Sequence, residues 1–202
     1  MDNIDSIFYI NLDHRADRRE EIEAELTKAG ITNFERFPAI RSNPGIIGCG
    51  LSHLAVLKLA RSRGYRNVLI FEDDFEFLVD RETFWKYMED LFKEVKSYDV
   101  IMLAYYAPQT EPFSALVQKV KEAQTASGYL VHSKFYDALI TLYEDAMPKL
   151  VDTGEHWNYA NDQVWKLLQP ISEWYATTTR IGKQRASMSD TGTGPVFHDY
   201  GI

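Results

Sequence analysis

The chain has 202 residues, of which 45% are hydrophobic, and this is enough apolar material for one well-buried domain. Its formal net charge of -8 argues against a nucleic-acid partner or an anionic-membrane surface, because no cationic stripe could neutralise a row of phosphates. A single cysteine, Cys49, excludes an intrachain disulfide and favours a reducing compartment. Since no apolar stretch reaches the length of a membrane span, we expect an unprocessed cytoplasmic protein without an integral membrane segment.

The first half of the chain alternates apolar runs of strand length with amphipathic helices. After the first apolar run, Ile22, Leu26 and Ala29 recur at helical spacing, and Gly30 ends that pattern. The predicted elements are a strand over 6–12, a helix over 15–29, a strand over 34–40, a helix over 47–63, a strand over 68–71 and a helix over 80–96 with Asp80 as its N-cap.

The second half continues the alternation. The predicted elements are strands over 100–105 and 126–131, a helix capped by Ser133 that ends near Pro148, a short helix over 158–168, a strand over 171–179 and a polar tail over 182–202. Strands that alternate with helices predict an α/β fold with a mostly parallel central sheet flanked by helices.

Three acids, Glu72, Asp73 and Asp74, directly follow the apolar strand over 68–71. In open α/β sheets, ligands bind outside the carboxyl ends of the strands, so these acids are expected where a metal or a substrate would bind. Carboxylate oxygens suit a hard cation such as Mg²⁺ or Mn²⁺. The alternative for this motif alone is an acidic turn exposed to solvent.

Three arginines, Arg15, Arg18 and Arg19, cluster between the first strand and the first helix. Guanidinium groups and helix N–H groups at such a position can bind a diphosphate or a nucleobase. The alternative is a solvated helix face on which arginine and glutamate pair four residues apart.

The segment 45–53 contains three glycines followed by Ser52 and His53 near the start of a predicted helix. Glycines allow a close approach of the backbone to a ligand, and a helix N-terminus favours anions. The lysine and the hydroxyl residue that end a phosphate-binding loop are missing. Cys49 fits a small buried side chain better than a nucleophile, and His53 fits a packing role or a ligand role equally well.

Three motifs occur in a characteristic order: Ile10-Asn11-Leu12-x-x-Arg15-x-x-Arg18-Arg19, Gly45-x-x-Gly48-Cys49-x-Leu51-Ser52-His53 and Leu69-Ile70-Phe71-Glu72-Asp73-Asp74. Together they resemble glycosyltransferase family 25, which includes lipopolysaccharide-modifying transferases and collagen galactosyltransferases. A weaker likeness continues through Ser127-Gly128-Tyr129-Leu130-Val131 and Ser189-Asp190. The resemblance implies a GT-A fold, a divalent metal that is usually manganese, a UDP-sugar donor and inversion at the anomeric carbon.

The resemblance also implies roles for individual residues. Glu72 and Asp74 stand where the DXD-like motif of the family bridges the metal to the donor diphosphate, with Asp73 facing the sugar or supporting the loop. A bound cation would stabilise the charge of the departing diphosphate. The residues at positions that hold the uridine and the phosphates are Asn11, Leu12, Arg15, Arg19, Ala39 and Ser52.

An inverting transferase further requires a carboxylate that deprotonates the acceptor hydroxyl, and Asp162 is the candidate. Its alternative role is that of an acid favoured by the dipole at a helix start. His198 is a candidate third metal ligand from the tail, which could close over the donor as a lid that excludes water. Four aromatic residues could stack on a sugar or lie in the core: Trp157, Tyr159, Trp165 and Trp174.

We predict one GT-A (Rossmann-like) domain over 1–202, with a nucleotide-sugar and metal half over about 1–105 and an acceptor half with the tail over about 106–202. The predicted activity transfers a hexose, galactose or glucose favoured, from a UDP-sugar to a hydroxyl of a glycan, lipopolysaccharide or protein-linked acceptor. The chain is short for the family between Asp99 and Gly128 and after Asp162, where acceptor specificity normally resides. A metal-dependent phosphohydrolase and a catalytically inactive nucleotide- or glycan-binding module are the alternatives, and the oligomeric state is open.

Overall fold

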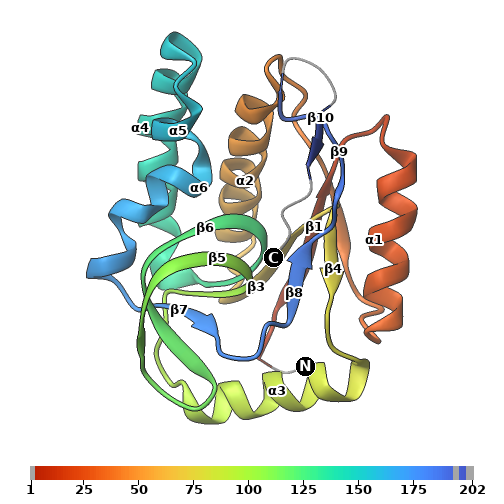
Figure 1. Cartoon of the computed structure of the whole chain (residues 1–202), viewed down its shortest axis with the longest axis vertical. Coiled ribbons are helices and arrows are strands. Elements are labelled where there is room, and N and C mark those ends of the chain that lie inside the picture. The colour runs from red at the N-terminus through yellow and green to blue at the C-terminus, as the bar shows by residue number, and fades with distance from the viewer. Residues whose placement is uncertain (1–2, 193–195, 199–202) are drawn as a thin grey trace.

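Alternating side chains of β1 (Ser6–Asn11) supply apolar groups to both faces of a central sheet. Ile7 and Tyr9 belong to one core cluster, and Phe8 and Ile10 belong to the cluster on the opposite face. The computed structural model describes residues 3–192 in full and the backbone of residues 196–198 (Figure 1).

The central sheet has six strands in the order β2-β1-β3-β6-β5-β7. β1 pairs in parallel with both β2 and β3, and β5 pairs in parallel with β7, whereas β6 is antiparallel to its neighbours β3 and β5. The mostly parallel sheet is therefore confirmed, with β6 as the one reversed strand. The bounds of these partner strands are β2 Glu35–Pro38, β3 Asn67–Glu72, β5 Val100–Pro112, β6 Val117–His132 and β7 Trp174–Thr177.

Helices cover both faces of the sheet. α2 (Gly45–Ser62) and α4 (Tyr136–Thr153) bury their apolar sides against one face, and α1 (Ala16–Lys28) and α3 (Arg81–Glu94) cover the other. Asp80 caps α3 as predicted, because its side chain accepts a hydrogen bond from Thr83 N at 2.8 Å. Within the described part of the chain, no helix has both the length and the apolarity that a membrane span needs.

β5 and β6 are much longer than predicted. Their outer halves form a hairpin with several register shifts, and β7 pairs with both strands, so these three strands close on one another (Figure 1). The predicted limits at residues 105 and 126 are wrong because the outer half of β5 is mostly exposed or half-buried, and the outer half of β6 is largely polar with only every third residue buried. A short apolar run marks only the part of each strand that lies in the buried sheet.

The helical predictions for the second half also need correction. A 3₁₀ turn over Ser133–Phe135 precedes α4, so Ser133 does not cap that helix, and α4 continues past Pro148 to Thr153. Burial of the apolar side of α4 against α2 offsets the hydrogen bond that proline removes. The single helix predicted over 158–168 is instead a series of short helical turns: α5 (His156–Tyr159), α6 (Asn161–Val164), η2 (Trp165–Leu167) and η3 (Gln169–Ile171).

The predicted polar tail contains strands and crosses the domain. β8 (Gly182–Gln184) pairs antiparallel with β4 (Phe75–Phe77), directly after the three acids. β9 (Ser187–Ser189) pairs with β10 (Val196–His198). Between β9 and β10 the chain reaches the start of α2, so the tail lies along the carboxyl-end edge of β1 and β3 (Figure 1).

Candidate active site

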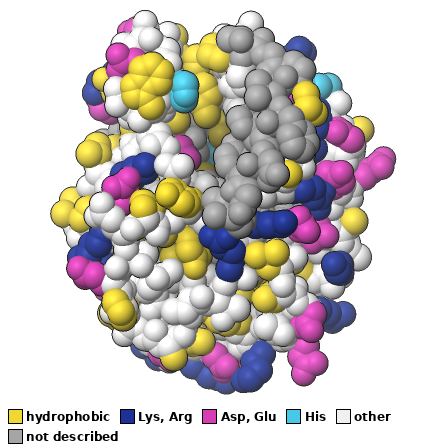
Figure 2. Space-filling view, in the orientation of Figure 1, with side chains coloured by type: hydrophobic (Ala, Val, Ile, Leu, Met, Phe, Trp, Pro, Cys, Tyr) yellow, Lys and Arg dark blue, Asp and Glu magenta, His cyan; other side chains and the backbone are white. Residues whose placement is uncertain are grey.

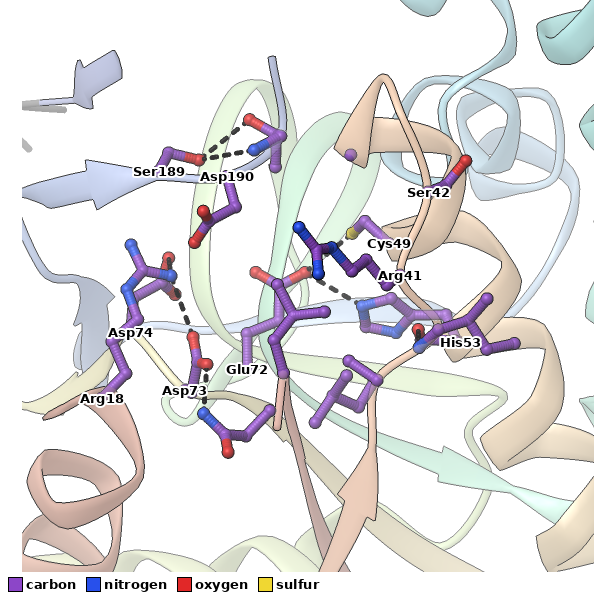
Figure 3. A pocket seen from close by; sticks show the side chains of 18 of the residues that line it. Arg18, Arg41, Ser42, Cys49, His53, Glu72, Asp73, Asp74, Ser189 and Asp190 are labelled. Carbon is purple, nitrogen blue, oxygen red and sulfur yellow. Dashed lines mark hydrogen bonds and ion pairs between the residues drawn. The ribbon is translucent and has the colours of Figure 1, made fainter. Parts of the chain in front are cut away.

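A pocket of about 330 Å³ opens where β1, β2 and β3 end (Figure 3). The carboxyl ends of parallel strands meet at one edge of the sheet, and this edge is where α/β folds bind ligands. The first turns of α2 and the tail segment 189–192 complete the walls. The volume lies within the range of small-molecule sites. In the view of Figure 2, acidic and basic side chains are interspersed over the surface of the described residues.

Arg18 enters this pocket from the first turn of α1 and is almost fully buried. Its Nη1 lies 2.9 Å from Asp73 Oδ1 and 3.6 Å from Asp74 Oδ2. Its Nη2 donates to the Ser187 hydroxyl and, at 2.8 Å, to the Met188 carbonyl oxygen. One guanidinium therefore joins α1, the acids after β3 and the tail.

Both carboxylate oxygens of Asp73 accept hydrogen bonds from other side chains of the protein. Asn11 Nδ2 donates to Asp73 Oδ2 at 2.7 Å, and Arg18 donates to the other oxygen. Asn11 also accepts from Arg36 Nε at 3.0 Å and is almost fully buried, so both ends of its amide are engaged by protein groups. Burial raises the pKa of Asp73 although Arg18 and Asn11 act in the opposite direction.

Asp74 is the acid with free coordination capacity. Its Oδ2 accepts from Gln184 Nε2 at 2.9 Å, but its buried Oδ1 has no hydrogen-bond partner among the described residues. Burial, and next the negative charges of Glu72 and Asp73, raise the pKa of Asp74 to about 7. An unpaired carboxylate oxygen in an acidic cluster is costly unless a cation or a proton offsets the charge.

Glu72 lies at the end of β3 and faces α2. Its Oε1 accepts from His53 Nε2 at 2.9 Å, and the Cys49 thiol lies 3.5 Å from the same oxygen. Tyr129 holds the other ring nitrogen of His53 at 2.9 Å. Burial is the largest single influence and acts to raise the pKa of Glu72, but the hydrogen bonds from His53 and Cys49, together with the positive charges nearby, outweigh it, so that the pKa is lowered.

Gly45 is the first residue of α2 and lines the pocket, but Gly48 and Gly50 lie inside the helix, which corrects the prediction that all three glycines bring the backbone close to a ligand. A Cβ on Gly48 would lie 2.1 Å from the Ile40 carbonyl oxygen, and one on Gly45 would lie 1.8 Å from the Asp190 carbonyl oxygen. These glycines allow other parts of the chain to pack against the helix. Ser52 is fully buried, and its hydroxyl donates to Gly48 O at 2.6 Å and accepts from Ile40 N at 2.8 Å.

Some of the other residues that were predicted to bind the sugar donor lie at the pocket, and one lies outside it. Leu12 and Ala39 line the pocket beside the ends of β1 and β2. Arg15 lies at its rim, where it pairs with Asp17 and with Asp190 of the tail. Arg19 points to solvent and pairs with Glu23, so its neighbour Arg18 is the arginine that reaches the acids.

Residues 43–165 match the sequence profile of Glycosyltransferase family 25 (LPS biosynthesis protein), and this match covers more than half of the chain. The chain belongs to glycosyltransferase family 25. Among its curated relatives, procollagen galactosyltransferase 2 of Mus musculus is 30% identical over 154 residues, which are 62% of this chain and 25% of that protein. Inactive glycosyltransferase 25 family member 3 of Homo sapiens is 31% identical over 127 residues, which are 49% of this chain and 21% of that protein. The chain thus spans about a quarter of the length of these family members.

Solved structures show the same fold. A glycosyltransferase involved in the glycosylation of the major capsid of PBCV-1 aligns with a TM-score of 0.55 at 10% identity, over 92% of this chain and 94% of that chain. Apo UDP-glucose pyrophosphorylase aligns with a TM-score of 0.51 at 10% identity, over 93% of this chain and 77% of that chain. The predicted α/β fold of the GT-A type is therefore confirmed for this family 25 chain.

The remaining predicted residues lie outside the pocket lining or outside the described side chains. Asp162 is the second residue of α6, where its Oδ2 accepts from Thr125 N at 3.1 Å. Burial, with a contribution from the charge of Glu72, raises the pKa of Asp162. The backbone of His198 pairs with Ser187, but its side chain lies outside the described residues, so its predicted role as a metal ligand stays a prediction.

The four aromatic candidates divide between core and surface. Trp165 and Trp174 are fully buried and pack edge-to-face in the core, with ring centroids 5.0 Å apart. Tyr159 packs partly buried against the same cluster, whereas Trp157 is 61% exposed. Only Trp157 presents a broad open face that a sugar could stack on.

The divalent cation that family 25 implies fits the acids after β3. Glu72 and Asp74 offer carboxylate oxygens, which are the donors that Mn²⁺ and Mg²⁺ prefer. The unpaired Oδ1 of Asp74 is the observation that makes this fit specific. The sequence placed Arg18 in the arginine cluster but favoured Arg15 and Arg19 for the donor, although the spacing of Arg18 from buried Ile22 and Leu26, four and eight residues on, places it on the inward face of α1.

Proposed function

We propose that this family 25 chain is a metal-dependent, inverting glycosyltransferase. It would transfer a hexose, galactose or glucose favoured, from a UDP-sugar to a hydroxyl of a glycan, lipopolysaccharide or protein-linked acceptor. The observation that carries the proposal is the unpaired carboxylate oxygen of Asp74 beside Glu72, at the carboxyl ends of parallel strands in a family 25 chain.

Glu72 and Asp74 would hold Mn²⁺ or Mg²⁺, with His198 as a candidate further ligand. When bound, the cation would stabilise the negative charge that develops on the departing diphosphate. Arg18 lies 2.9 Å from Asp73 and 3.6 Å from Asp74, and the other oxygen of Asp74 is unpaired among the described residues, so Asp74 together with Glu72 is available to a cation. Leu12 and Ala39 offer an apolar wall for the uracil ring at the far side of the same pocket.

The tail would cover the bound donor. Ile46 N donates to Thr191 O at 2.7 Å and Gly45 N donates to Gly192 O at 3.2 Å, so the tail is anchored to the first turn of α2. Arg15 and Arg18 anchor the same segment from the side of α1. A covered site excludes water, which would otherwise hydrolyse the donor.

Asp162 would act as the general base. The acceptor hydroxyl oxygen would attack the anomeric carbon while the bond from that carbon to the diphosphate oxygen breaks, and Asp162 would take the hydroxyl proton. The raised pKa of Asp162 suits it to hold that proton. The hydrogen bond from Thr125 N fixes one of its oxygens, because the carboxylate then cannot rotate freely.

The test is release of UDP from a panel of UDP-hexoses in the presence of Mn²⁺, with and without glycan acceptors. We expect acceptor-dependent release that Asp74→Asn abolishes and that Glu76→Gln leaves unchanged. Glu76 lies two residues further on and makes only a loose pair with Lys183 at 3.7 Å, which makes it a matched control. The proposal would be overturned if the rate of UDP release were the same with and without Mn²⁺ and the same in wild type and Asp74→Asn.

Two other outcomes identify the alternatives. One curated relative is named inactive, and a chain that binds UDP without any turnover would be a nucleotide- or glycan-binding module. Liberation of inorganic phosphate from phosphate esters without a sugar acceptor would instead indicate a phosphohydrolase.

A further inference from the structure

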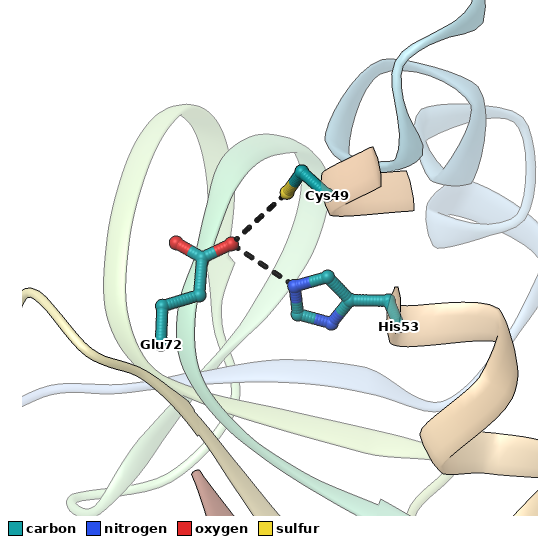
Figure 4. A group of neighbouring side chains, drawn as sticks. All are labelled: Cys49, His53 and Glu72. Atoms are coloured by element: carbon teal, nitrogen blue, oxygen red, sulfur yellow. Dashed lines mark hydrogen bonds and ion pairs between the residues drawn. The ribbon is translucent and has the colours of Figure 1, made fainter. Parts of the chain in front are cut away.

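Next to the acids, three side chains of different chemistry converge on one point (Figure 4). Cys49 and His53 lie one turn apart on α2, and Glu72 reaches them from the end of β3. Their ligand atoms, the cysteine sulfur, a ring nitrogen and a carboxylate oxygen, all lie within 4.8 Å of one another. Spacings of this size are those between the ligands of one small metal ion.

The mixed donor set points to a different metal from the one that the acids suit. Thiolate and imidazole select zinc and related ions, whereas sites made only of oxygen select magnesium and manganese. Glu72 belongs to both groups, because Oε1 faces Cys49 and His53 while the other oxygen points away from them (Figure 4).

The surroundings of His53 resemble the support that metal-bound histidines receive. A histidine ligand usually donates its second ring N–H to an outer partner, which fixes its orientation. Here the hydroxyl of Tyr129 lies 2.9 Å from Nδ1, and the two rings are stacked with centroids 5.7 Å apart. Nε2 is thereby directed toward Glu72 and Cys49.

We propose that Cys49, His53 and Glu72 form a second metal site, which takes one thiophilic divalent cation of the zinc type. As the metal–sulfur bond forms, the thiol releases its proton to solvent. The proton that Nε2 of His53 shares with Glu72 moves through solvent to Nδ1, so that Nε2 binds the ion and the N–H on Nδ1 faces the Tyr129 hydroxyl. Cys49 and Glu72 both line the pocket, so the ion has an entry path and an open fourth position.

A metal ion at this second site would affect the binding of Mn²⁺ by Glu72 and Asp74, an inference that rests on the proposed function. Zinc at the second site would engage Glu72, which Mn²⁺ would otherwise share with Asp74. Glu72 would then bridge the two ions, one on each oxygen, and the repulsion between two divalent charges on one carboxylate would make zinc an inhibitor of manganese-dependent UDP binding.

The test uses Co²⁺ as a spectroscopic probe for zinc in the full chain. Because Cys49 is the one cysteine of the sequence, a sulfur-to-cobalt charge-transfer band reports on it alone. We expect this band to saturate at one equivalent of Co²⁺, to disappear when Zn²⁺ is added and to be absent in Cys49→Ser. A folded wild-type chain without the band, or equal zinc binding by wild type and Cys49→Ser in calorimetry, would overturn the proposal.

A matched pair of variants separates metal binding from a general effect on folding. Tyr129→Phe removes the partner of His53 and should weaken Co²⁺ binding about tenfold. Tyr143→Phe should leave Co²⁺ affinity unchanged, since the Tyr143 hydroxyl is also buried but has no partner among the described residues. Equal effects of the two substitutions on Co²⁺ affinity would contradict the role given to Tyr129.

The glycosyltransferase proposal and the proposal of a second metal site can be refuted independently of each other. Asp74→Asn should lose manganese-dependent UDP binding but keep the cobalt band, which is read without nucleotide. Zn²⁺ should weaken UDP binding in Mn²⁺ about tenfold in wild type and have little effect in Cys49→Ser, each compared with the same protein without Zn²⁺. A cobalt band without any UDP binding would refute the transferase proposal and leave the second metal site standing.

Discussion

Arg18 and Asp73 form a buried ion pair, with 2.9 Å between Nη1 and Oδ1, that joins the first turn of α1 to the end of β3. Asp74 lies 3.6 Å from the same nitrogen, and the tail accepts hydrogen bonds from the other end of the guanidinium. This one side chain therefore offsets part of the negative charge of the pocket and also positions the segment that covers it.

Replacing Arg18 by alanine should destabilise the fold strongly. Removal of one partner of a buried ion pair leaves an uncompensated charge, which costs about 3–5 kcal/mol of unfolding free energy. Arg19→Ala is the matched control, because the exposed pair of Arg19 with Glu23 is worth about 1 kcal/mol or less. Urea denaturation measures the unfolding free energy of both variants. Equally small decreases in Arg18→Ala and Arg19→Ala would contradict the role given to Arg18.

Gly45→Ala should release the tail from α2. A Cβ at this position would lie 1.8 Å from the Asp190 carbonyl oxygen, so the tail must move and its bonds to Gly45 N and Ile46 N must break. Alanine is the better helix former by about 1 kcal/mol, so global stability should not fall in parallel. Hydrogen exchange at Ile46 should become faster and hydrolysis of the UDP-sugar by water should increase. Unchanged exchange at Ile46 would show that the tail is not held there.

The sequence predicted the parts of the site that depend on side-chain pattern. The apolar run before Glu72 marked a buried strand, and the motifs of segments 10–19 and 45–53 placed β1 and α2 around the same sheet edge. The tail gave only a weak signal, the family likeness at Ser189-Asp190, because it is anchored largely through its own carbonyl oxygens, at Met188, Thr191 and Gly192. Every residue type carries that acceptor.

Long-range partners were the other part that the sequence did not reveal. Tyr129 lies 76 residues from His53, and Gln184 lies 110 residues from Asp74, so nothing in a local window connects them. The reversed strand β6 brings Tyr129 next to β3, and the pairing of β8 with β4 brings Gln184 to the acids. These contacts follow from topology, which periodicity alone does not determine.

Asp162→Asn tests the assignment of the general base. The side-chain oxygen of asparagine can still accept from Thr125 N, so the fold should be retained while the proton acceptor is lost. We expect kcat for sugar transfer to fall by about 10²–10⁴ and the Kd for UDP to stay within about twofold. Asp152→Asn, at an exposed position near the end of α4, should leave both unchanged. A kcat for Asp162→Asn within a few-fold of wild type would exclude Asp162 as the base.

Metal-dependent nucleotide binding is the central claim, and calorimetric titration with UDP tests it most directly. In wild type and in Glu76→Gln, Mn²⁺ should tighten UDP binding by at least about tenfold relative to buffer with a chelator, a change of about 1.4 kcal/mol. In Asp74→Asn this gain should vanish, because the unpaired oxygen beside Glu72 is no longer a carboxylate oxygen. UDP binding that is the same with and without Mn²⁺, and the same in wild type and Asp74→Asn, would contradict the account.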